Sequence, residues 1–376
     1  MKILYNLAGT FNSGGMERIV ISKANALNEA GFRVFIVTTE QQGRKPYFKI
    51  DDRIECIDLG INYSRDNGRL LHKLLHFPFR QRKHLCMLRK VIEEKDPDII
   101  ISTFGNEVRV LPKIKTRAKK VLEIHFSKYF RTQENRRGLW RIIDRLRTRQ
   151  DQRTVSAYDK FIVLTYEDKA LWGDIPNIEV IPNFIDNVST APAKLENKKC
   201  LAIGRLTYQK GFDRLVSIWP LVHKQCPEWE LAIYGNGEQR ENLQRQIEKM
   251  GLSDSIEIHD PTSEISEVYQ NISILLSTSR YEGLPMVLIE GLSHGLPIVS
   301  YACKCGPRDI IEDVVNGFIV EEGDADAFAT RVIELINNYE LRKQIGYNAW
   351  MSSQKYTKDV VMLRWTKLFT ELHRIK

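Results

Sequence analysis

The chain has 376 residues, of which 43% are hydrophobic and 28% are charged, and its formal net charge is +8 at pH 7. This length exceeds one ordinary hydrophobic core and predicts two domains, and the composition excludes a disordered or fibrous protein. No apolar run reaches the ~18 residues that a membrane-spanning helix needs, and the opening segment is too short for a signal peptide, so we expect a cytoplasmic protein.

The N-terminal half predicts alternating strands and helices. Residues 1–8 form a buried strand in this interpretation, and a turn with Gly14 and Gly15 then leads into a helix over 16–30. A strand, glycine turn, helix and strand in succession is the βαβ unit of a parallel sheet. The second and later strands are expected at 34–38, 98–102, 120–124 and 160–164. These elements predict a Rossmann-like domain over residues 1–185.

A second α/β series follows a boundary near residues 183–198, where Pro192 and a polar run interrupt the pattern. Its strands are expected at 199–203, 229–234, 256–259, 272–276 and 298–301. We expect a second Rossmann-like domain over residues 186–356, and a last helix within 357–376 that crosses back to the first domain. Ligands of such sheets bind at the carboxyl ends of the strands, so the candidate site is a cleft between the two domains.

The loop from Gly204 to Gly211 opens the second domain and carries Arg205 and Lys210. Glycines permit a sharp turn off the strand, so both cations can reach one anion at the carboxyl end of the sheet. Two cations at about 4 Å from a diphosphate are each worth a few kcal/mol at an effective dielectric near 20, before desolvation is subtracted. The alternative interpretation is an ordinary strand–helix turn with surface cations.

Two carboxylates, Glu282 and Glu290, flank a predicted loop-to-helix junction. Pro285 suits the first turn of a helix that ends at Gly295. At about 1.5 Å rise per residue, the carboxylates are expected on the order of 10 Å apart, with the helix N-terminus between them. A diphosphate favours such a terminus, and hydroxyl-bearing rings on either side favour carboxylate acceptors, so the spacing indicates a sugar-nucleotide site.

Three residues of the first domain are expected at the same cleft. Gly14 and Gly15 let a ligand approach the backbone closely, although a glycine pair more often marks a tight turn. His125 follows a predicted strand, and the alternative is a strand-end histidine satisfied by the backbone.

Two Asp-x-Asp pairs could hold a divalent cation, but neither is expected at the cleft. Asp96 and Asp98 join a helix end to a strand start, and Asp324 is expected to cap the helix that contains Asp326. We therefore expect no metal.

Together these segments resemble the family 4 retaining glycosyltransferases, which have the GT-B fold, over nearly the whole chain. The strongest matches are Gly204-Arg205-Leu206 through Lys210-Gly211, Glu282-Gly283 through Glu290, and Gly306-Pro307-Arg308-Asp309 with Asn316-Gly317. Weaker matches are Gly14-Gly15-Met16-Glu17-Arg18, Ile181-Pro182-Asn183 and Tyr234-Gly235-Asn236-Gly237. The sequence is similar to members that build bacterial capsule, exopolysaccharide or lipid-linked oligosaccharide.

The resemblance implies a role for each matching position. The implied catalytic residues are Arg205, Lys210, Glu282 and His125. The implied donor-binding residues are Gly14, Gly15, Arg205, Lys210, Glu282, Gly283, Leu284, Met286, Val287 and Glu290. The two cations would hold the departing diphosphate, Glu290 would accept hydrogen bonds from the ribose, and Glu282 would contact the transferred sugar.

The implied reaction transfers a hexose or N-acetylhexosamine from a nucleotide sugar, with UDP as the nucleotide, to a saccharide or lipid-linked acceptor with retention of configuration. No cofactor is implied. Two alternatives stay open at this point: a sugar-nucleotide epimerase of similar architecture, and a non-catalytic protein that binds sugar nucleotides.

The charge is unevenly distributed. Residues 1–190 hold 34 Lys and Arg against 23 Asp and Glu, whereas residues 191–376 hold 22 against 25. Segments 65–90 and 128–153 combine cations with apolar residues, as helices on a membrane surface do. These apolar residues are Leu70, Leu71, Leu74, Leu75, Phe77 and Phe79 in the first segment, and Leu139, Trp140, Ile142, Ile143 and Leu146 in the second.

The basic segments leave more than one interpretation open. The first is an anionic membrane surface on the inner face of the cytoplasmic membrane. The second is that the apolar residues pack on the sheet and the cations form a solvated face. Nucleic acid is not expected as a partner, because the segments carry no recognisable nucleic-acid motif.

Overall fold

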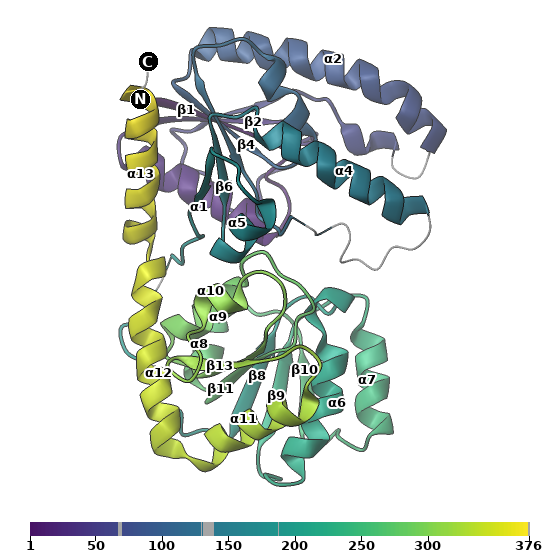
Figure 1. Ribbon diagram of the computed structural model, residues 1–376, viewed down its shortest axis with the longest axis vertical. Helices are drawn as coiled ribbons and strands as arrows, with labels where there is room; N and C mark the ends of the chain where they lie inside the picture. The colour runs from purple at the N-terminus through teal and green to yellow at the C-terminus, as the bar shows by residue number, and fades with distance from the viewer. Residues whose placement is uncertain (67–69, 129, 131–138, 187, 375–376) are drawn as a thin grey trace.

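The computed structural model of the protein describes residues 1–66, 70–128, 130, 139–186 and 188–374. In this part of the chain two α/β domains lie one above the other, and α12 (Tyr339–Ser353) and α13 (Lys358–Arg374) run along one side of both (Figure 1). The two Rossmann-like domains face each other, so the predicted GT-B architecture is confirmed.

The N-terminal sheet is parallel throughout, with the strand order β3-β2-β1-β4-β5-β6-β7. Its strands are β1 (Lys2–Leu7), β2 (Arg33–Thr38), β3 (Glu55–Asp58), β4 (Ile99–Thr103), β5 (Lys119–Glu123), β6 (Lys160–Val163) and β7 (Ile178–Val180). The α-helices that follow them include α1 (Gly15–Glu29), α2 (Leu70–Lys95), α4 (Leu139–Val155) and α5 (Tyr166–Trp172). Ile3, Leu4 and Tyr5 of β1 are all fully buried, because helices cover both faces of the sheet.

The C-terminal sheet is also parallel, with the order β10-β9-β8-β11-β12-β13. Its strands are β8 (Lys199–Ile203), β9 (Glu230–Tyr234), β10 (Ile256–His259), β11 (Ile274–Ser277), β12 (Ile298–Tyr301) and β13 (Gly317–Val320). The helices of this half are α6 (Phe212–His223), α7 (Arg240–Lys249), α8 (Ile265–Gln270), α9 (Met286–Ser293), α10 (Pro307–Ile310), α11 (Ala325–Asn337) and α12. Asp324 caps α11 as expected, since its side chain accepts a hydrogen bond from the backbone N–H of Ala327 at 2.9 Å.

Sequence patterning missed three strands, β3, β7 and β13, and all three lie at the edge of a sheet. Edge strands are short and have one neighbour, so they need no continuous apolar run. In β3 no residue is buried, and β7 has only three residues.

Helix α13 packs on the N-terminal domain, although it follows the C-terminal one in sequence. Trp365, Leu368 and Phe369 are buried in one hydrophobic cluster with residues of β1 and α1. The guanidinium of Arg364 donates a hydrogen bond to the carbonyl of Val180. These contacts tie the end of the chain to the first domain.

The apolar residues of α2 divide between the core and the surface. Leu88, Val91 and Ile92 are buried in the N-terminal core, whereas Leu75 and Phe79 are each 69% exposed. The side chains of Leu70, Leu71 and Leu74, and of Leu139, Trp140, Ile142, Ile143 and Leu146 in α4, lie outside the described residues. Among the described apolar residues named for segment 65–90, Phe77 packs against this core and Leu75 and Phe79 do not, so the interpretation that they pack on the sheet holds for part of α2 only.

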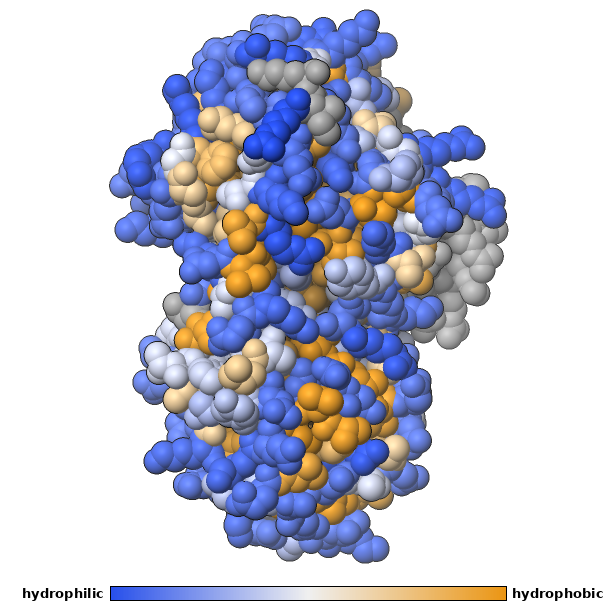
Figure 2. Space-filling model, turned by 60° about the vertical axis from the view of Figure 1, so that its left-hand side comes forward, coloured by the Kyte–Doolittle hydropathy of each residue, from blue (hydrophilic) through white to orange (hydrophobic). Residues whose placement is uncertain are grey.

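The face of the molecule shown in Figure 2 is mostly hydrophilic, with separate hydrophobic areas on both domains. No helix in the described ranges is long and apolar enough to cross a membrane.

Gly211 ends the loop after β8 in a left-handed conformation, with φ of +66°. A Cβ at this position would lie 2.1 Å from the carbonyl oxygen of Thr278, and the Thr278 hydroxyl donates a hydrogen bond to the Gly211 carbonyl at 2.9 Å. Only glycine fits so close to the end of β11 in this conformation.

We expect Gly211→Ala to lower the free energy of unfolding by about 3 kcal/mol or more, because it adds a backbone clash to left-handed strain. Gly251→Ala is the matched control, since Gly251 has φ of +67° and no atom within 4 Å of its Cβ position. The control should cost only about 1–2 kcal/mol. Urea unfolding followed by circular dichroism measures both, and equal losses would contradict the packing argument.

Candidate functional site

Two loops of the C-terminal domain are joined side by side at the carboxyl ends of β8 and β11. Gln209 Nε2 donates to the Tyr281 carbonyl at 3.0 Å, and the backbone N–H of Arg280 donates to the Gln209 carbonyl at 2.8 Å. The Arg280 guanidinium also pairs with Asp213 at 2.6 Å. The loop with the predicted cations is thereby fixed against the loop with Glu282.

Lys210 and Glu282 form the central contact of this site. Lys210 Nζ lies 2.7 Å from Glu282 Oε1, and the same oxygen accepts a hydrogen bond from the Ser279 hydroxyl at 2.7 Å. The side chains are 17% and 7% exposed, so the pair is largely shielded from water. A Cβ on Gly204 would lie 3.0 Å from Lys210 Cε, so the lysine crosses directly over this glycine.

Arg205 differs from Lys210, although both lie on the same loop. Its side chain is exposed and makes no hydrogen bond or ion pair with any described residue. It is therefore the cation of this loop that is free to meet an anion.

The N-terminus of α9 lies between the two predicted carboxylates. Pro285 is the N-cap residue and provides no side-chain hydrogen bond, so the first N–H groups of the helix have no partner within it. Leu284 is buried in the core, while Met286 and Val287 are half-buried at the start of the helix. Such a helix start favours an anion.

Glu290 is held from both domains. Its Oε1 lies 3.0 Å from Arg18 Nη2, and its Oε2 accepts a hydrogen bond from the Tyr269 hydroxyl at 3.1 Å. Arg18 belongs to α1, which begins at Gly15 with Gly14 as its N-cap residue. No atom lies within 4 Å of a Cβ placed on Gly15, so the backbone is open there.

The structure brings His125 directly against Gly283. A Cβ on Gly283 would lie 2.8 Å from the His125 carbonyl oxygen and 2.8 Å from Phe126 Cα. Glycine is thus required where the Glu282 loop meets the end of β5. The His125 ring itself faces Glu123, with 2.6 Å between Nε2 and Oε1.

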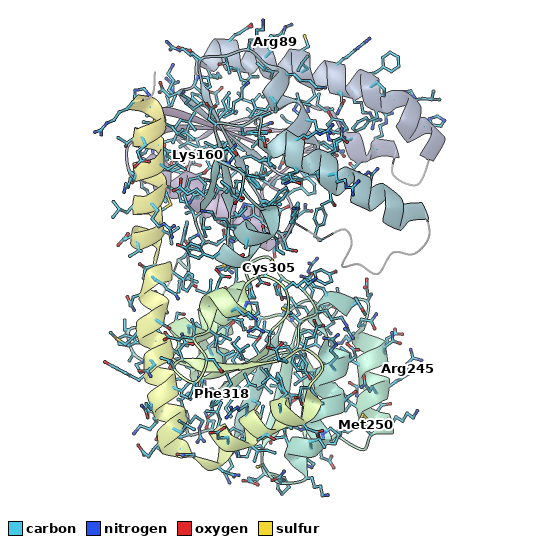
Figure 3. The ribbon with its side chains drawn as sticks, viewed as in Figure 1. Arg89, Lys160, Arg245, Met250, Cys305 and Phe318 are labelled. Carbon is cyan, nitrogen blue, oxygen red and sulfur yellow. The ribbon has the colours of Figure 1, made fainter. Side chains whose placement is uncertain are left out.

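A further contact holds the domains together beside this site. Asp309 accepts hydrogen bonds from the backbone N–H groups of Tyr166 at 2.6 Å and Glu167 at 3.3 Å, at the start of α5. In return Glu167 Oε2 accepts the backbone N–H of Cys305 at 2.9 Å, and Cys305 lies between the domains (Figure 3). Burial raises the pKa of the neighbouring Asp168 to about 6, although three hydrogen bonds oppose that rise.

The predicted residues therefore gather in three groups: Lys210 with Glu282, His125 with Gly283, and Glu290 with the helix that Gly14 and Gly15 begin. Arg18, Glu123 and Asp309 were missed as individual site residues. Arg18 and Asp309 lie inside motifs that resemble those of the family, and Glu123 lies two positions before His125. For Arg18 and Asp309 the motif was the available signal, although the residues that they contact are distant in sequence.

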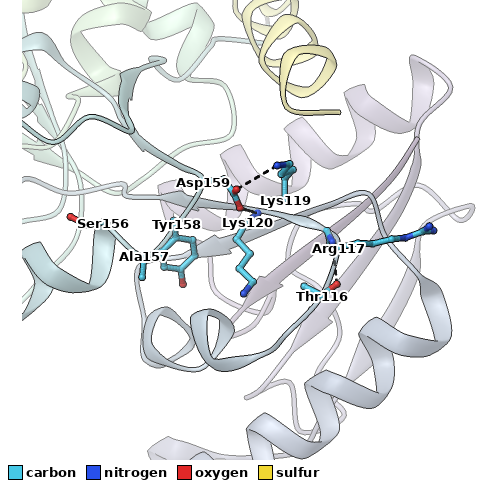
Figure 4. A pocket seen from close by; sticks show the side chains of 9 residues that line it. Thr116, Arg117, Lys119, Lys120, Ser156, Ala157, Tyr158 and Asp159 are labelled. Atoms are coloured by element: carbon cyan, nitrogen blue, oxygen red, sulfur yellow. Dashed lines mark hydrogen bonds and ion pairs between the residues drawn. The ribbon is translucent and has the colours of Figure 1, made fainter. Parts of the chain in front are cut away.

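A hollow of about 280 Å³ lies away from all these residues (Figure 4). Lys119, Lys120 and Asp159 are among the residues that line it, at the amino ends of β5 and β6. His125 follows the opposite end of β5, so this hollow is no part of the candidate site.

Among the described residues no group of three or more His, Cys, Asp or Glu side chains is arranged to hold a metal ion. The six cysteines are all free, with Cys56 and Cys86 exposed and the other four buried.

Two family models match the chain, one for each domain. The family described as Glycosyltransferase Family 4 matches residues 13–188, and the family described as Glycosyl transferases group 1 matches residues 186–350.

Full-length relatives agree with these matches. An uncharacterized glycosyltransferase of Haemophilus influenzae is 30% identical over 97% of this chain and 98% of its own length. The amylovoran biosynthesis glycosyltransferase AmsD of Erwinia amylovora is 30% identical over 98% of this chain and 99% of its own.

A solved structure of a Staphylococcus aureus TarM mutant, in complex with fondaparinux, alpha-GlcNAc-glycerol and UDP, has a TM-score of 0.76 to this chain. The match covers 98% of this chain and 100% of that one at 17% identity, so it concerns the fold alone.

Proposed function

Because the chain belongs to the family 4 glycosyltransferases of the GT-B fold, we propose that it transfers a sugar from a UDP-sugar to a saccharide or lipid-linked acceptor. The transferred group is a hexose or N-acetylhexosamine, and its anomeric configuration is retained. The name of AmsD supports a role in surface polysaccharide biosynthesis, and the UDP in the TarM complex supports the choice of nucleotide.

The Lys210–Glu282 contact beside the start of α9 carries this proposal. A cation, an uncapped helix N-terminus and two carboxylates, Glu282 on the loop before α9 and Glu290 within α9, suit a ligand with a diphosphate between two hydroxyl-bearing rings. In this assignment the diphosphate meets Arg205, Lys210 and the first N–H groups of α9. Glu290 accepts the ribose hydroxyls, and Glu282 accepts hydroxyls of the transferred sugar.

The chemistry follows from where charge develops. The bond between the anomeric carbon and the phosphate oxygen breaks, which leaves an oxocarbenium-like sugar and a more negative diphosphate. Fixed cations and N–H dipoles aimed at that phosphate lower the barrier. The acceptor hydroxyl attacks from the same face, and its proton passes to the departing phosphate oxygen. This sequence retains the configuration and needs no protein nucleophile.

Product analysis tests the proposed reaction against its alternatives. The purified protein would be incubated with a panel of UDP-sugars, with and without saccharide and lipid-linked acceptors, and the products separated by mass and linkage. Acceptor-dependent glycoside formation with release of UDP supports the proposal. A change of the sugar on the nucleotide without an acceptor would indicate an epimerase, and saturable binding without turnover would indicate a binding protein.

We expect Arg205→Ala to reduce turnover by at least about a hundredfold while the fold is retained, because it removes a charge that stabilises the departing diphosphate. Arg245→Ala, an exposed arginine of α7 on another part of the same domain, is the matched control (Figure 3). Initial rates at saturating donor, with circular dichroism as the folding check, provide the measurement. Near-normal turnover of Arg205→Ala would refute the role.

We also propose that turnover requires no metal, since Arg205, Lys210 and the helix N–H groups supply the positive charge. Activity measured after dialysis against a chelator should stay within about twofold of the untreated rate, because no step depends on a divalent cation. A loss that added magnesium restores would overturn this proposal.

The basic first half supports a second proposal, that the protein rests on an anionic membrane surface where it receives a lipid-linked acceptor. On α2 the exposed Leu75 and Phe79 precede the exposed cations Arg82, Lys83, Arg89 and Lys90. Arg89 lies on the side of the N-terminal domain that faces away from the C-terminal one (Figure 3). Apolar side chains beside cations are the combination that binds anionic lipid surfaces.

Co-sedimentation with liposomes tests this surface. We expect binding to phosphatidylserine vesicles but not to neutral ones at low salt, and at least about a threefold loss of binding in Leu75→Ser. Leu363→Ser on α13 is the matched control, because Leu363 is 70% exposed and Leu75 is 69% exposed. Equal binding to both kinds of vesicle, or equal loss in both variants, would contradict it.

A further inference from the structure

A buried charge network lies directly behind His125 in the N-terminal domain. Lys23 of α1 and Glu123, the last residue of β5, have side chains only 2% and 1% exposed, and their Nζ and Oε1 atoms lie 2.5 Å apart. The same Oε1 atom lies 2.6 Å from His125 Nε2, and the His125 side chain is 5% exposed. One carboxylate oxygen is thus shared between a lysine and a histidine in the protein interior.

Helix α13 closes the network from the other side. Lys23 Nζ lies 3.9 Å from the centre of the Trp365 ring and 5.8 Å from that of Tyr5. Burial lowers the pKa of Lys23, although the nearby Glu123 opposes that shift. Burial alone would raise the pKa of Glu123, but Lys23 and His125 outweigh it and hold that pKa at about 2. The carboxylate is therefore ionised when it faces the histidine.

The polar atoms of this network are not all satisfied. Within the described chain, Glu123 Oε2 and both ring nitrogens of His125 lack a hydrogen bond of acceptable geometry. The His125 Nε2 atom lies within hydrogen-bonding distance of Glu123 Oε1 without meeting the angular requirement, so the ring must rotate to form the bond. Buried polar groups without partners cost about 1–3 kcal/mol each, and stability alone gives no reason to keep them.

The stability of the fold also does not explain why Lys23 and Glu123 form a buried ion pair. A buried pair of this kind is often replaced by apolar groups of similar volume at no loss of stability. The network nevertheless leads to the interdomain contact, since the His125 backbone lies against Gly283, and the residue before Gly283 is Glu282. The network therefore lies beside the candidate site without being accounted for by stability.

We propose that Glu123, held in place by Lys23, is a positioning residue for His125. Glu123 accepts the hydrogen bond of Nε2–H, which fixes the ring orientation and tautomer and leaves Nδ1 as the unprotonated nitrogen of the ring. This inference rests on the proposed function and on the catalytic role that the family resemblance implies for His125. It adds a named partner and a named ring nitrogen to that role.

Kinetics in two backgrounds test the positioning role. We expect Glu123→Gln to lower kcat by about tenfold or more with donor KM changed less than about threefold, since the wrong tautomer would be admitted. In a His125→Ala background the same change should have almost no effect, because the group that Glu123 positions is gone. Additive losses in the two backgrounds would overturn the proposal and leave a structural role only.

Two further variants separate folding from positioning. Glu123→Gln alone leaves Lys23 buried without its partner, which can prevent folding. Lys23→Met combined with Glu123→Gln places neutral groups at both positions, and we expect it to fold and to show the same loss of kcat. Glu179→Gln is the matched control, because Glu179 pairs with Lys160 at 3.1 Å between β6 and β7. Its kcat should stay within about twofold of the parent.

Nitrogen NMR of histidine-labelled protein gives a readout that needs no turnover. The His125 signals are assigned by their loss in His125→Ala, and we expect the proton on Nε2 in the parent protein and a mixture of tautomers in Glu123→Gln. A proton on Nδ1 in the parent would overturn the positioning role even if transfer is observed. The expected tautomer in a protein without transfer activity would instead count against the proposed function alone.

Discussion

The contact between Lys210 and Glu282 is the interaction on which the arrangement of the site depends. It joins side chains 72 positions apart in sequence, on loops after two adjacent strands of the C-terminal sheet. A largely buried carboxylate without a counter-charge would be strongly destabilising, so each loop needs the other in place. Two glycines give the backbone the shape that this contact needs. Gly204 leaves room for the Lys210 side chain, and Gly211 lets the chain pass close to the end of β11.

The two domains are coupled at the same place by short polar contacts. Arg18 reaches Glu290 from α1, Asp309 accepts the first N–H groups of α5, and Gly283 packs on the end of β5. The chain then returns through α13, whose Trp365 covers Lys23. Residues of both domains thus define one site, and a shift of either domain would change the surroundings of Glu282 and Glu290 together.

The sequence predicted the interior of both sheets well and their edges poorly. Strands such as β1 and β11 are buried on both sides, so their apolar runs are long enough to recognise, while β3 has no buried residue to mark it. In the site, spacing identified Arg205, Lys210, Glu282 and Glu290 but treated the two cations as equivalent. Only three-dimensional placement separates the paired Lys210 from the exposed Arg205, because the difference depends on Ser279 and Glu282 in a distant loop.

The same limit explains why Arg18 and Glu123 had no assigned role. Arg18 contacts Glu290, and Glu123 contacts Lys23 as well as the nearby His125; Glu290 and Lys23 each lie more than 90 positions away, and no local pattern reports such a partner. Periodicity describes which face of an element is buried, and it does not identify which charges meet across two elements.

Both carboxylates of the site, Glu282 and Glu290, already accept hydrogen bonds in the structure, and this affects which nucleotide sugar the site selects. Lys210 and Ser279 donate hydrogen bonds to Glu282, while Arg18 and Tyr269 donate hydrogen bonds to Glu290. On the proposed roles, a diphosphate draws Lys210 away from Glu282, and a ribose displaces Arg18 from Glu290. The hydroxyls of the ribose and the transferred sugar must then replace the lost donors, because an unsatisfied buried carboxylate is costly. On these roles, a diphosphate that lacks the transferred sugar would draw Lys210 away from Glu282 without supplying a replacement hydrogen-bond donor, so the site would discriminate against it by the same mechanism that rejects substrates without a required hydroxyl.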